Sequence, residues 1–494
     1  MRLKNLPSLA ILLSFSTALI SCSSHVAEVG NQASNATAQE SPMPDQQVAR
    51  DDRGDLPGKP DLVPQISNRD AIPESFPLVV DPKPVAPVKV AQLPKPPVVA
   101  APPPVAVAQD DADQLAQPAP QVPVSGIDGR TIGGFRAKLT ALEAGRLNRP
   151  ITILHIGDSH VADDSFTRGV RARLQQRFGN AGRGAVIPAN AFAHANEAGV
   201  TLTASGGWNG NMSLHDGDGV YGVSGVRVDG SSPSAVMKLS SDTEFDRASV
   251  TAATGPNQGG FTVSVNGKAY HFTGESAQVG AKTFEIAAHG SSIEIRPDGN
   301  GDVALLNWST TRDEPGIRYV NFGQIGATVR VTQRWNAAAV ANDVKAIKPD
   351  LIVYGFGTNE GFDGNTDLVG YRKTALDFIN RLKASAPDAA VAIIGASDSL
   401  KRGGSGCGGG WGSPPKLAGV RDTMKGVAQE IGAFYWDWSQ AMGGLCSMAR
   451  WAELGLGSPD HIHLTPKGYE VSAEKFTAAL LGPLGTKPFS VAAQ

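Results

Sequence analysis

Hydrophobic residues follow two different periodicities along this chain, and the change between them divides it. Four of the six residues 151–156 are apolar, and Gly157 follows them, which predicts a buried strand. Apolar residues then recur at four-residue spacing, which predicts an amphipathic helix over 166–178. A strand followed closely by a helix is the repeating unit of α/β folds.

The same alternation resumes at residue 316 and continues to the end of the chain's periodic region. Strands are predicted at 317–322, 350–356, 390–395 and 433–436, and helices at 332–346, 371–386, 416–431 and 466–481. A further helix is predicted at 127–147, before the first strand. Thr465 is a suitable N-cap for the last of these helices. Alternating strands and helices predict a mainly parallel sheet covered on both faces, a three-layer α/β/α fold.

Between the two α/β segments, residues 191–312 lose the helical spacing and alternate over short runs. Two examples are FTVSVNGKAYHF and SSIEIRP. The pair Asn266-Gly267 predicts a hairpin with a type I′ turn. Several such strands predict an all-β sandwich inserted into the α/β fold. Four aromatic residues are candidates for stacking on sugar rings, although the interior is the commoner place for each: Trp208, Tyr221, Tyr270 and Trp308.

The first 123 residues contain no periodic pattern that would build a core. Residues 22–123 are dominated by Pro, Ala, Val, Gln and Asp, which predicts a disordered, Pro-rich tether. Residues 1–21 have a basic start and an apolar run too short to span a bilayer, as in a signal peptide. The predicted divisions are 1–21, 22–123, 124–190, 191–312 and 313–485, and the α/β fold occupies the third and the fifth.

The signal peptide ends in Leu19-Ile20-Ser21-Cys22, which resembles a bacterial lipobox. The resemblance implies cleavage before Cys22 and attachment of lipid to its thiol, so that a membrane is an expected partner. Because Ser23 follows, it also implies the periplasmic side of the outer membrane. A secreted or soluble periplasmic protein is the alternative, and in both cases the mature chain works outside the cytoplasm.

Composition narrows the chemistry further. The chain has 494 residues, which exceeds one hydrophobic core, and its net charge of −3 gives no reason to expect a nucleic-acid partner. Cys407 and Cys446 are expected to form a disulfide in an oxidising compartment. Neither has companion ligands at zinc spacing, so no metal site and no cofactor are expected.

Polar residues with catalytic potential follow the predicted strands. Ser159 lies between a strand and a helix, where α/β sheets bind ligands and where helix amides stabilise negative charge. Asp460 and His463 are three residues apart, so one turn brings the carboxylate and the imidazole to the same side. An imidazole that a carboxylate orients is what activates a serine hydroxyl. The competing histidine, His461, would be turned away from Asp460.

Two other strand ends carry groups that can stabilise an oxyanion. Gly326 can present its backbone amide with no side chain in the way. Asn359 can present a side-chain amide. Both precede the Asp-His pair in the chain, and both follow a predicted strand.

Four sequence blocks occur in the order found in the SGNH (GDSL-like) hydrolases, which this chain resembles from about Arg130 to Leu481, the insertion excluded. The blocks are GDSH at 157–160, the IGAT glycine at 326, GTNE at 357–360 and DHIH at 460–463. The chain departs from this family at His160, where many relatives have Leu, and at Glu360, where many have Asp. Neither residue is expected to touch the chemistry.

The resemblance implies an ester-hydrolysing serine and a role for each matching residue. Ser159 would be the nucleophile, His463 the general base, and Asp460 the residue that orients His463. The Ser159 amide, the Gly326 amide and the Asn359 side chain would form the oxyanion hole.

A GDSH block, a β-rich insertion and a lipoprotein-type signal together resemble the bacterial peptidoglycan O-acetylesterases. In those enzymes a carbohydrate-binding-module-like sandwich interrupts the catalytic domain. The resemblance implies removal of acetyl from the C6 hydroxyl of N-acetylmuramic acid, with cell-wall glycan or another acetylated polysaccharide as partner. Two alternatives stay open. One is an O-acetyltransferase that uses the same triad to move acetyl onto a glycan hydroxyl, and the other is a non-catalytic wall-binding lipoprotein.

Overall fold

The computed structural model describes residues 126–192 and 197–486. The predicted signal peptide at 1–21, the tether at 22–123 and Cys22 lie outside these residues. Among the helices that the structure describes, none combines the length and the apolar character needed to cross a membrane.

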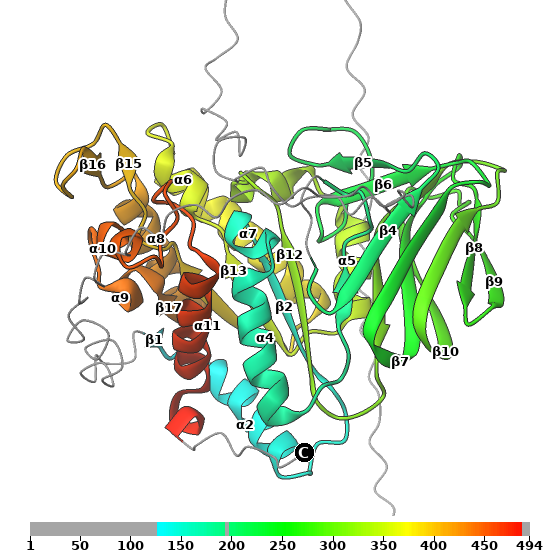
Figure 1. Cartoon of the computed structure of the whole chain (residues 1–494), viewed down its shortest axis with the longest axis horizontal. Helices are drawn as coiled ribbons and strands as arrows, with labels where there is room; N and C mark the ends of the chain where they lie inside the picture. Colours follow the sequence, from blue (N-terminus) through cyan, green and yellow to red (C-terminus); the bar gives the residue numbers. More distant parts are fainter. Residues whose placement is uncertain (1–125, 193–196, 487–494) are drawn as a thin grey trace, which may run out of the picture. The chain divides into compact units, whose positions relative to one another are not determined.

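A six-stranded sheet forms the centre of the α/β fold (Figure 1). Its strands are β1 (Gly126–Ile127), β2 (Ile151–Gly157), β12 (Ile317–Gly323), β13 (Leu351–Gly355), β14 (Ala390–Gly395) and β17 (Phe434–Asp437). Their order is β1-β17-β14-β13-β2-β12, and every pairing is parallel except that of β1 with β17. Because β2 lies between β12 and β13, the carboxyl ends of these three strands adjoin where the strand order reverses, which is where such sheets bind ligands.

Side chains of β2 alternate between two hydrophobic cores, one on each face of the sheet. Ile151 and Ile153 belong to one core, and Leu154 and Ile156 belong to the other. Helices α2 (Ile132–Glu143), α4 (Ser165–Phe178) and α11 (Pro466–Leu481) pack in the first core, and α5 (Ala337–Ile347), α7 (Leu368–Ser385) and α8 (Leu417–Ile431) pack in the second. Successive strand residues point to opposite faces, so a strand covered on both sides needs a nearly continuous apolar run. The predicted three-layer α/β/α fold is confirmed.

Side-chain caps set where two of the helices begin. Thr465 Oγ1 accepts the Gly468 N–H at 3.2 Å, and α11 begins at the next residue, a proline. The Asn336 side chain accepts the Ala339 N–H at 3.0 Å and so starts α5. The helix predicted for 332–346 is therefore two elements, because this cap separates α5 from the 3₁₀ turn η2 (Val329–Arg334).

A nine-stranded antiparallel sheet separates the two α/β segments. Its strands are β3 (Gly184–Val186), β4 (Val200–Ser205), β5 (Asn209–Met212), β6 (Val226–Gly230), β7 (Val236–Thr254), β8 (Gly260–Val265), β9 (Lys268–Thr273), β10 (Gly280–Pro297) and β11 (Val303–Thr311). Because β3 pairs with β11, the sheet begins before the predicted boundary at 191. Asn266 and Gly267 join β8 to β9 with φ angles of 50° and 77°, as a type I′ turn requires, and the predicted hairpin is confirmed.

The long strands β7 and β10 give this sheet two halves. Their mutual pairing shifts register at Ala287, Gly290 and Ser292, and bulges of this kind bend strands. On one side of the shifts they pair with β4 and β8, and on the other β7 pairs with β11. Buried side chains of both halves, such as Leu239 and Val250, belong to one core. The insertion is thus a sandwich whose two layers share their central strands.

The core of the insertion continues into the α/β fold. Val340 and Val344 of α5 belong to the same core as the insertion strands. Between them the buried Asp343 accepts the Val223 N–H and the Asn307 side-chain N–H, both at 2.9 Å. Burial raises the pKa of Asp343 to about 6 despite these two hydrogen bonds. The insertion and α5 therefore share apolar packing and a buried polar contact.

Candidate active site

Ser159 lies where β2 ends and the short helix α3 (Ser159–Ala162) begins. The preceding Asp158 caps this helix, since its Oδ1 accepts the His160 N–H at 3.1 Å. Burial raises the pKa of Asp158 to about 6, and the hydrogen bond from His160 and the nearby His463 limit the rise. Among the described residues, none accepts the Ser159 amide N–H. That amide is free to bind a developing negative charge at the start of the helix.

The serine, a histidine and an aspartate form one hydrogen-bonded chain. Ser159 Oγ lies 2.9 Å from His463 Nε2, and His463 Nδ1 lies 2.6 Å from Asp460 Oδ2. A carboxylate accepts and does not donate, so Nδ1 carries the proton and the Nε2 lone pair faces the hydroxyl. The structure thus brings together three residues that lie up to 304 positions apart.

The Asp460–His463 pair is set by a turn and not by a helix. Asp460 Oδ1 accepts the backbone N–H of Ile462 at 2.9 Å and of His463 at 3.0 Å. His461 within the turn has a left-handed φ of 55°. One carboxylate therefore holds the turn with Oδ1 and the imidazole with Oδ2. The expectation that one turn brings the two side chains to the same side holds, although the backbone there is not helical.

The two charged partners shift each other's pKa in opposite directions. Burial alone would raise the pKa of Asp460, but the hydrogen bond and the charge of His463 lower it to about 2. Burial alone would lower the pKa of His463, but Asp460 raises it above its ordinary value, and Asp158 and Asp163 contribute at longer range. The site therefore favours a carboxylate beside an imidazole that can take up a proton.

The competing histidine lies elsewhere. The rings of His461 and Trp411 stack with centroids 3.9 Å apart and planes 7° from parallel. Trp411 belongs to the small hairpin of β15 (Lys401–Arg402) and β16 (Trp411–Gly412). A disulfide ties Cys407, in the loop of this hairpin, to Cys446, just before helix α10 (Ser447–Glu453). The bridged loop therefore packs directly against the turn that carries Asp460 and His463.

The predicted oxyanion residues follow the strands on either side of β2. Gly326 lies after β12 with a left-handed φ of 76°, which a side chain would strain. Within the described part of the chain, no group accepts the Gly326 N–H. Asn359 lies after β13, in the short helix α6 (Thr358–Phe362), and its Nδ2 donates to the Ala327 carbonyl at 2.9 Å. This bond fixes the Asn359 amide to the loop that carries Gly326 and uses one of its two N–H groups.

Glu360 has a closer connection to this loop than the sequence indicated. Its Oε1 accepts the Val329 N–H at 2.6 Å, and Val329 begins the 3₁₀ turn that follows Gly326. The side chain is buried, which raises its pKa to about 8, so it is a neutral acid at pH 7. Glu360 therefore holds the backbone beside the predicted oxyanion donors.

His160 also contacts the predicted catalytic group. Its ring centroid is 5.3 Å from that of His463, and its Nδ1 lies 2.9 Å from the Tyr469 hydroxyl. Burial lowers the pKa of His160 to about 3, with the nearby charge of His463 acting in the same direction, so its ring is neutral. His160 therefore lies against the predicted base, which was not expected, whereas Glu360 bonds to the backbone beside the predicted oxyanion donors and not to a predicted catalytic residue. The residues at positions 160 and 360 both differ from those common in the resembled family, but their spacing in the sequence does not predict which groups their side chains contact.

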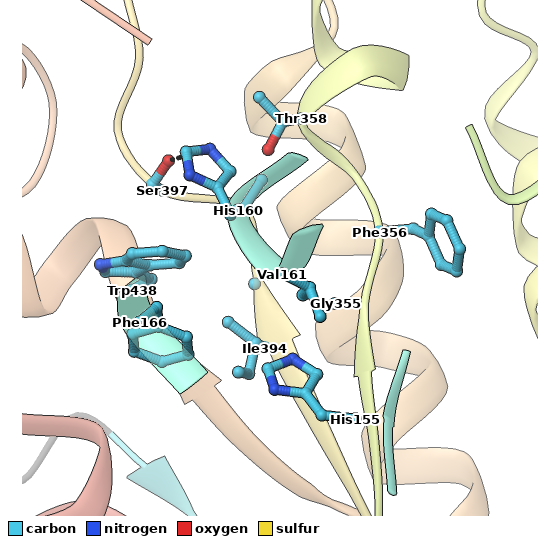
Figure 2. A pocket seen from close by; sticks show the side chains of 12 residues that line it. His155, His160, Val161, Phe166, Gly355, Phe356, Thr358, Ile394, Ser397 and Trp438 are labelled. Carbon is cyan, nitrogen blue, oxygen red and sulfur yellow. Dashed lines mark hydrogen bonds between the residues drawn. The ribbon is translucent and has the colours of Figure 1, made fainter. Parts of the chain in front are cut away.

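A small cavity lies behind His160, on the inner side of the site. Figure 2 shows His160 and Ser397 at its upper end, His155 at its lower end, and Trp438 and Phe166 along one side. Its volume of about 10 Å³ is on the order of one water molecule. An acylated sugar does not fit in this cavity.

The aromatic candidates of the insertion are mostly interior. Trp208, Tyr221 and Trp308 are buried, and Tyr270 is half-buried. Lys268 lies over the Tyr270 ring at 5.0 Å. These residues therefore leave Tyr270 as the single accessible member of the predicted set. The described residues contain no cluster of three or more His, Cys, Asp or Glu side chains that could hold a metal ion.

Comparisons with known proteins place these residues in context. Residues 288–471 match the GDSL-like Lipase/Acylhydrolase family. This range includes Gly326, Asn359, Asp460 and His463, whereas Ser159 precedes it on the other side of the insertion. No curated protein matches the chain.

Solved structures also match. One described as "Peptidoglycan O-acetylesterase in action, 5 min" aligns with a TM-score of 0.64 and 28% identity, over 72% of this chain and 97% of that chain. A putative GDSL-like lipase from Parabacteroides merdae has a TM-score of 0.27 and 16% identity, over 34% of this chain and 73% of that chain. A family two carbohydrate esterase from Cellvibrio japonicus has a TM-score of 0.24 and 13% identity, over 57% of this chain and 98% of that chain.

Proposed function

We propose that this chain, which belongs to the GDSL-like lipase/acylhydrolase family as its sequence blocks predicted, is a serine esterase that removes O-acetyl groups from a cell-envelope polysaccharide. The observation that carries the proposal is the hydrogen-bonded chain from Ser159 through His463 to Asp460. Peptidoglycan is the proposed substrate, because the solved O-acetylesterase is 28% identical and aligns over 97% of its own length.

The first half of the reaction transfers acetyl to the enzyme. Ser159 Oγ attacks the acetyl carbonyl carbon while its proton moves to His463 Nε2, 2.9 Å away. As the tetrahedral intermediate collapses, the carbon–oxygen bond to the sugar breaks, and His463 returns the proton to the sugar oxygen. The sugar leaves with a free hydroxyl, and acetyl stays on Ser159.

In both half-reactions, negative charge develops on the carbonyl oxygen, and stabilising this charge is the main requirement for catalysis. The Ser159 amide, the Gly326 amide and the Asn359 side chain are the proposed donors to that oxygen. Removal of one such donor typically costs about 3–4 kcal/mol of transition-state stabilisation. Asn359 and Glu360 both bond to the segment that follows Gly326, so the donors are held before the substrate arrives.

The second half releases the acetyl group. A water molecule gives a proton to His463 Nε2 and attacks the acetyl-serine carbonyl. The bond to Ser159 Oγ then breaks, Ser159 recovers the proton from His463, and acetate leaves. The net reaction converts an acetylated sugar and water into acetate, a proton and a free C6 hydroxyl of N-acetylmuramic acid.

The experiment is acetate release from O-acetylated peptidoglycan by the full chain, with the Ser159→Ala variant as control and with or without a chito-oligosaccharide acceptor. We expect the unchanged chain to release free acetate in equal amounts with and without the acceptor. The variant should release none. Acetyl on the acceptor would make the protein a transferase. Activity on p-nitrophenyl acetate but none on peptidoglycan would remove the substrate assignment and leave the esterase. Inertness toward both would favour the non-catalytic alternative.

We further propose that lipid on Cys22 anchors the chain to the periplasmic side of the outer membrane, with 22–123 as its tether. The proposal rests on the lipobox-like end of the signal peptide. The test is fractionation of cells that produce the chain or its Cys22→Ser variant. The unchanged chain should sediment with the outer membrane, and the variant should not. Equal partition of the two would support a soluble periplasmic protein.

A further inference from the structure

The inserted sheet contributes a turn to the neighbourhood of the active site. This turn, Met212–Asp216, follows β5, and the Met212 carbonyl accepts the N–H groups of His215 at 3.0 Å and Asp216 at 2.8 Å. Ser213 within it is buried, whereas Leu214 is half-buried. The turn therefore has a fixed inner side and a partly open outer side.

Side chains of the catalytic domain hold the inner side of this turn. Trp335 Nε1 donates to Ser213 Oγ at 2.9 Å, and Gln324 Nε2 donates to the same oxygen at 3.1 Å. Arg334 donates to the carbonyls of Ser213 at 2.8 Å and Leu214 at 2.7 Å. All three donors belong to the segment from 324 to 335, which also carries Gly326.

The same segment is tied to the strand that carries the nucleophile. The Gln324 N–H donates to the Gly157 carbonyl at 3.1 Å, and the Gln324 carbonyl accepts the Ala327 N–H at 3.2 Å. Gln324 thus links three features: the end of β2, the loop around Gly326, and the turn of the insertion. The turn cannot move away from the Gly326 loop without loss of these buried hydrogen bonds.

Leu214 lies directly beside the predicted oxyanion glycine. Its Cδ2 is 4.0 Å from the position that a Cβ on residue 326 would occupy, and it is the nearest atom to that position. Leu214 packs against the core that the insertion shares with the α/β fold. An apolar side chain on a turn whose backbone is held by hydrogen bonds therefore lies beside the glycine whose amide would bind the carbonyl oxygen of the substrate.

We propose that Leu214 sets the length of the acyl group that the enzyme accepts, so that acetyl fits and longer acyl chains do not. This inference rests on the proposed function, because it places the substrate carbonyl at Gly326. With that oxygen held, the rest of the acyl group extends only a short way before it meets Leu214. A methyl group packs favourably against this side chain, and each further methylene collides with it. The insertion thereby supplies a specificity-determining residue to a site whose chemistry lies in the other domain.

The test compares the full chain with Leu214→Ala on p-nitrophenyl acetate, butyrate and hexanoate. The matched control is Leu202→Ala, because Leu202 is another half-buried leucine of the insertion that packs against the same core. One methylene in an apolar pocket changes kcat/KM about 10-fold or more. We expect Leu214→Ala to raise the butyrate-to-acetate ratio of kcat/KM at least about 10-fold and Leu202→Ala to leave it unchanged.

The milder variant Leu214→Val keeps the test decisive if Leu214→Ala does not fold, and it should raise the same ratio by a smaller factor. An unchanged ratio in the folded variants, or an equal change in Leu202→Ala, would overturn the inference. Inactivity of the unchanged chain on every ester would overturn both the inference and the proposed function. The third outcome is that Leu214→Ala changes the butyrate-to-acetate ratio but the unchanged chain does not act on O-acetylated peptidoglycan. That outcome would support the role of Leu214 and contradict only the assignment of peptidoglycan as substrate.

Discussion

At the scale of single residues, the proposed site depends on a balance between burial and charge at His463. Burial favours its neutral form, whereas Asp460 and the more distant carboxylates favour its charged form, and the second effect is the larger. A general base must be neutral before it can accept a proton. The pKa of His463 therefore sets the pH below which the enzyme loses activity.

This balance predicts a specific pH profile. Because the pKa of His463 is raised, kcat/KM should fall below a pH that is higher than the ordinary histidine value of about 6.5. In Asp460→Asn the negative charge is gone, so the acidic limb should move to lower pH, and kcat should fall about 10³- to 10⁴-fold because the tautomer is no longer fixed. The measurement is hydrolysis of p-nitrophenyl acetate from pH 5 to 9. An acidic limb at the same pH in both proteins would show that His463 is not the titrating base.

The buried Glu360 leads us to expect that the free energy of unfolding, and not the activity, changes with the ionisation of this group. Its pKa is about 4.3 in the unfolded chain and about 8 when folded, because burial disfavours its charge. Below about pH 4.3 the carboxyl is neutral in both states, so the free energy of unfolding does not depend on its ionisation. Between about pH 4.3 and 8 the carboxyl ionises only in the unfolded chain, so the free energy of unfolding falls as the pH rises. The slope for one group cannot exceed about 1.4 kcal/mol per pH unit.

Glu360→Gln should remove that slope, because the amide oxygen can still accept the Val329 N–H but the group no longer ionises. The measurement is the free energy of unfolding in urea at several values between pH 5 and 8. We expect the advantage of the variant over the unchanged chain to grow steadily with pH. A constant difference between the two proteins would mean that Glu360 is ionised in the folded state.

At the scale of elements, the bridged hairpin of β15 and β16 supports the turn that carries the base. The Leu400 N–H, just before β15, donates to the His461 carbonyl at 2.8 Å, and Trp411 of β16 stacks on the His461 ring. The disulfide ties this hairpin to Cys446, 39 residues from Cys407. Glycine-rich loops lose much conformational entropy on folding, so this one gains from a covalent constraint.

Reduction of the disulfide should therefore weaken both stability and activity. The free energy of unfolding is expected to fall by about 2–4 kcal/mol, as for disulfides in general. The kcat on p-nitrophenyl acetate should also fall, because the turn around His461 loses its support. A Cys407→Ser, Cys446→Ser double variant should match the reduced protein, and Trp411→Ala should lower kcat with a smaller loss of stability. Full activity in the double variant would show that the hairpin does not position the turn.

At the scale of the whole described molecule, the insertion and the α/β fold are not separate bodies. Buried side chains of the insertion and of one face of the parallel sheet form one core, and Asp343 of α5 bonds to Val223 and Asn307 of the insertion. The turn at Ser213 adds a second polar contact near the proposed site. A module that only bound glycan would need none of these contacts.

Deletion of 191–312 should therefore unfold the catalytic domain, because the apolar face of α5 and the Asp343 carboxylate would lose their partners. The expected result is loss of the near-ultraviolet circular dichroism signal and of activity on p-nitrophenyl acetate. The matched control is deletion of 22–123, the predicted tether, which should preserve both. A folded, active deletion of 191–312 would show that the insertion is an independent domain.

The sequence was sufficient for most of the elements and for their order, but the helix predicted for 127–147 is shorter, at Ile132–Glu143, and Ile127 belongs to strand β1. Periodicity reports which face of a strand or helix is buried, so β2, α4, α11 and the Asn266-Gly267 hairpin were predicted close to their observed bounds. It missed the break between η2 and α5, because a single capping residue, Asn336, outweighs the apolar spacing there. The bend within the long strands was missed too, since it depends on register and not on composition.

The sequence by itself determined the fold class and the residues with catalytic potential, because both rest on local patterns: apolar period, glycines at strand ends, and short polar blocks. The tertiary structure alone decided what those residues touch. It decided that His160 lies against His463, that Trp411 covers His461, and that Leu214 stands beside Gly326. These contacts join segments far apart in the chain. The local pattern determines on which face of its own strand or helix a side chain lies. Only tertiary packing determines which distant element that side chain contacts.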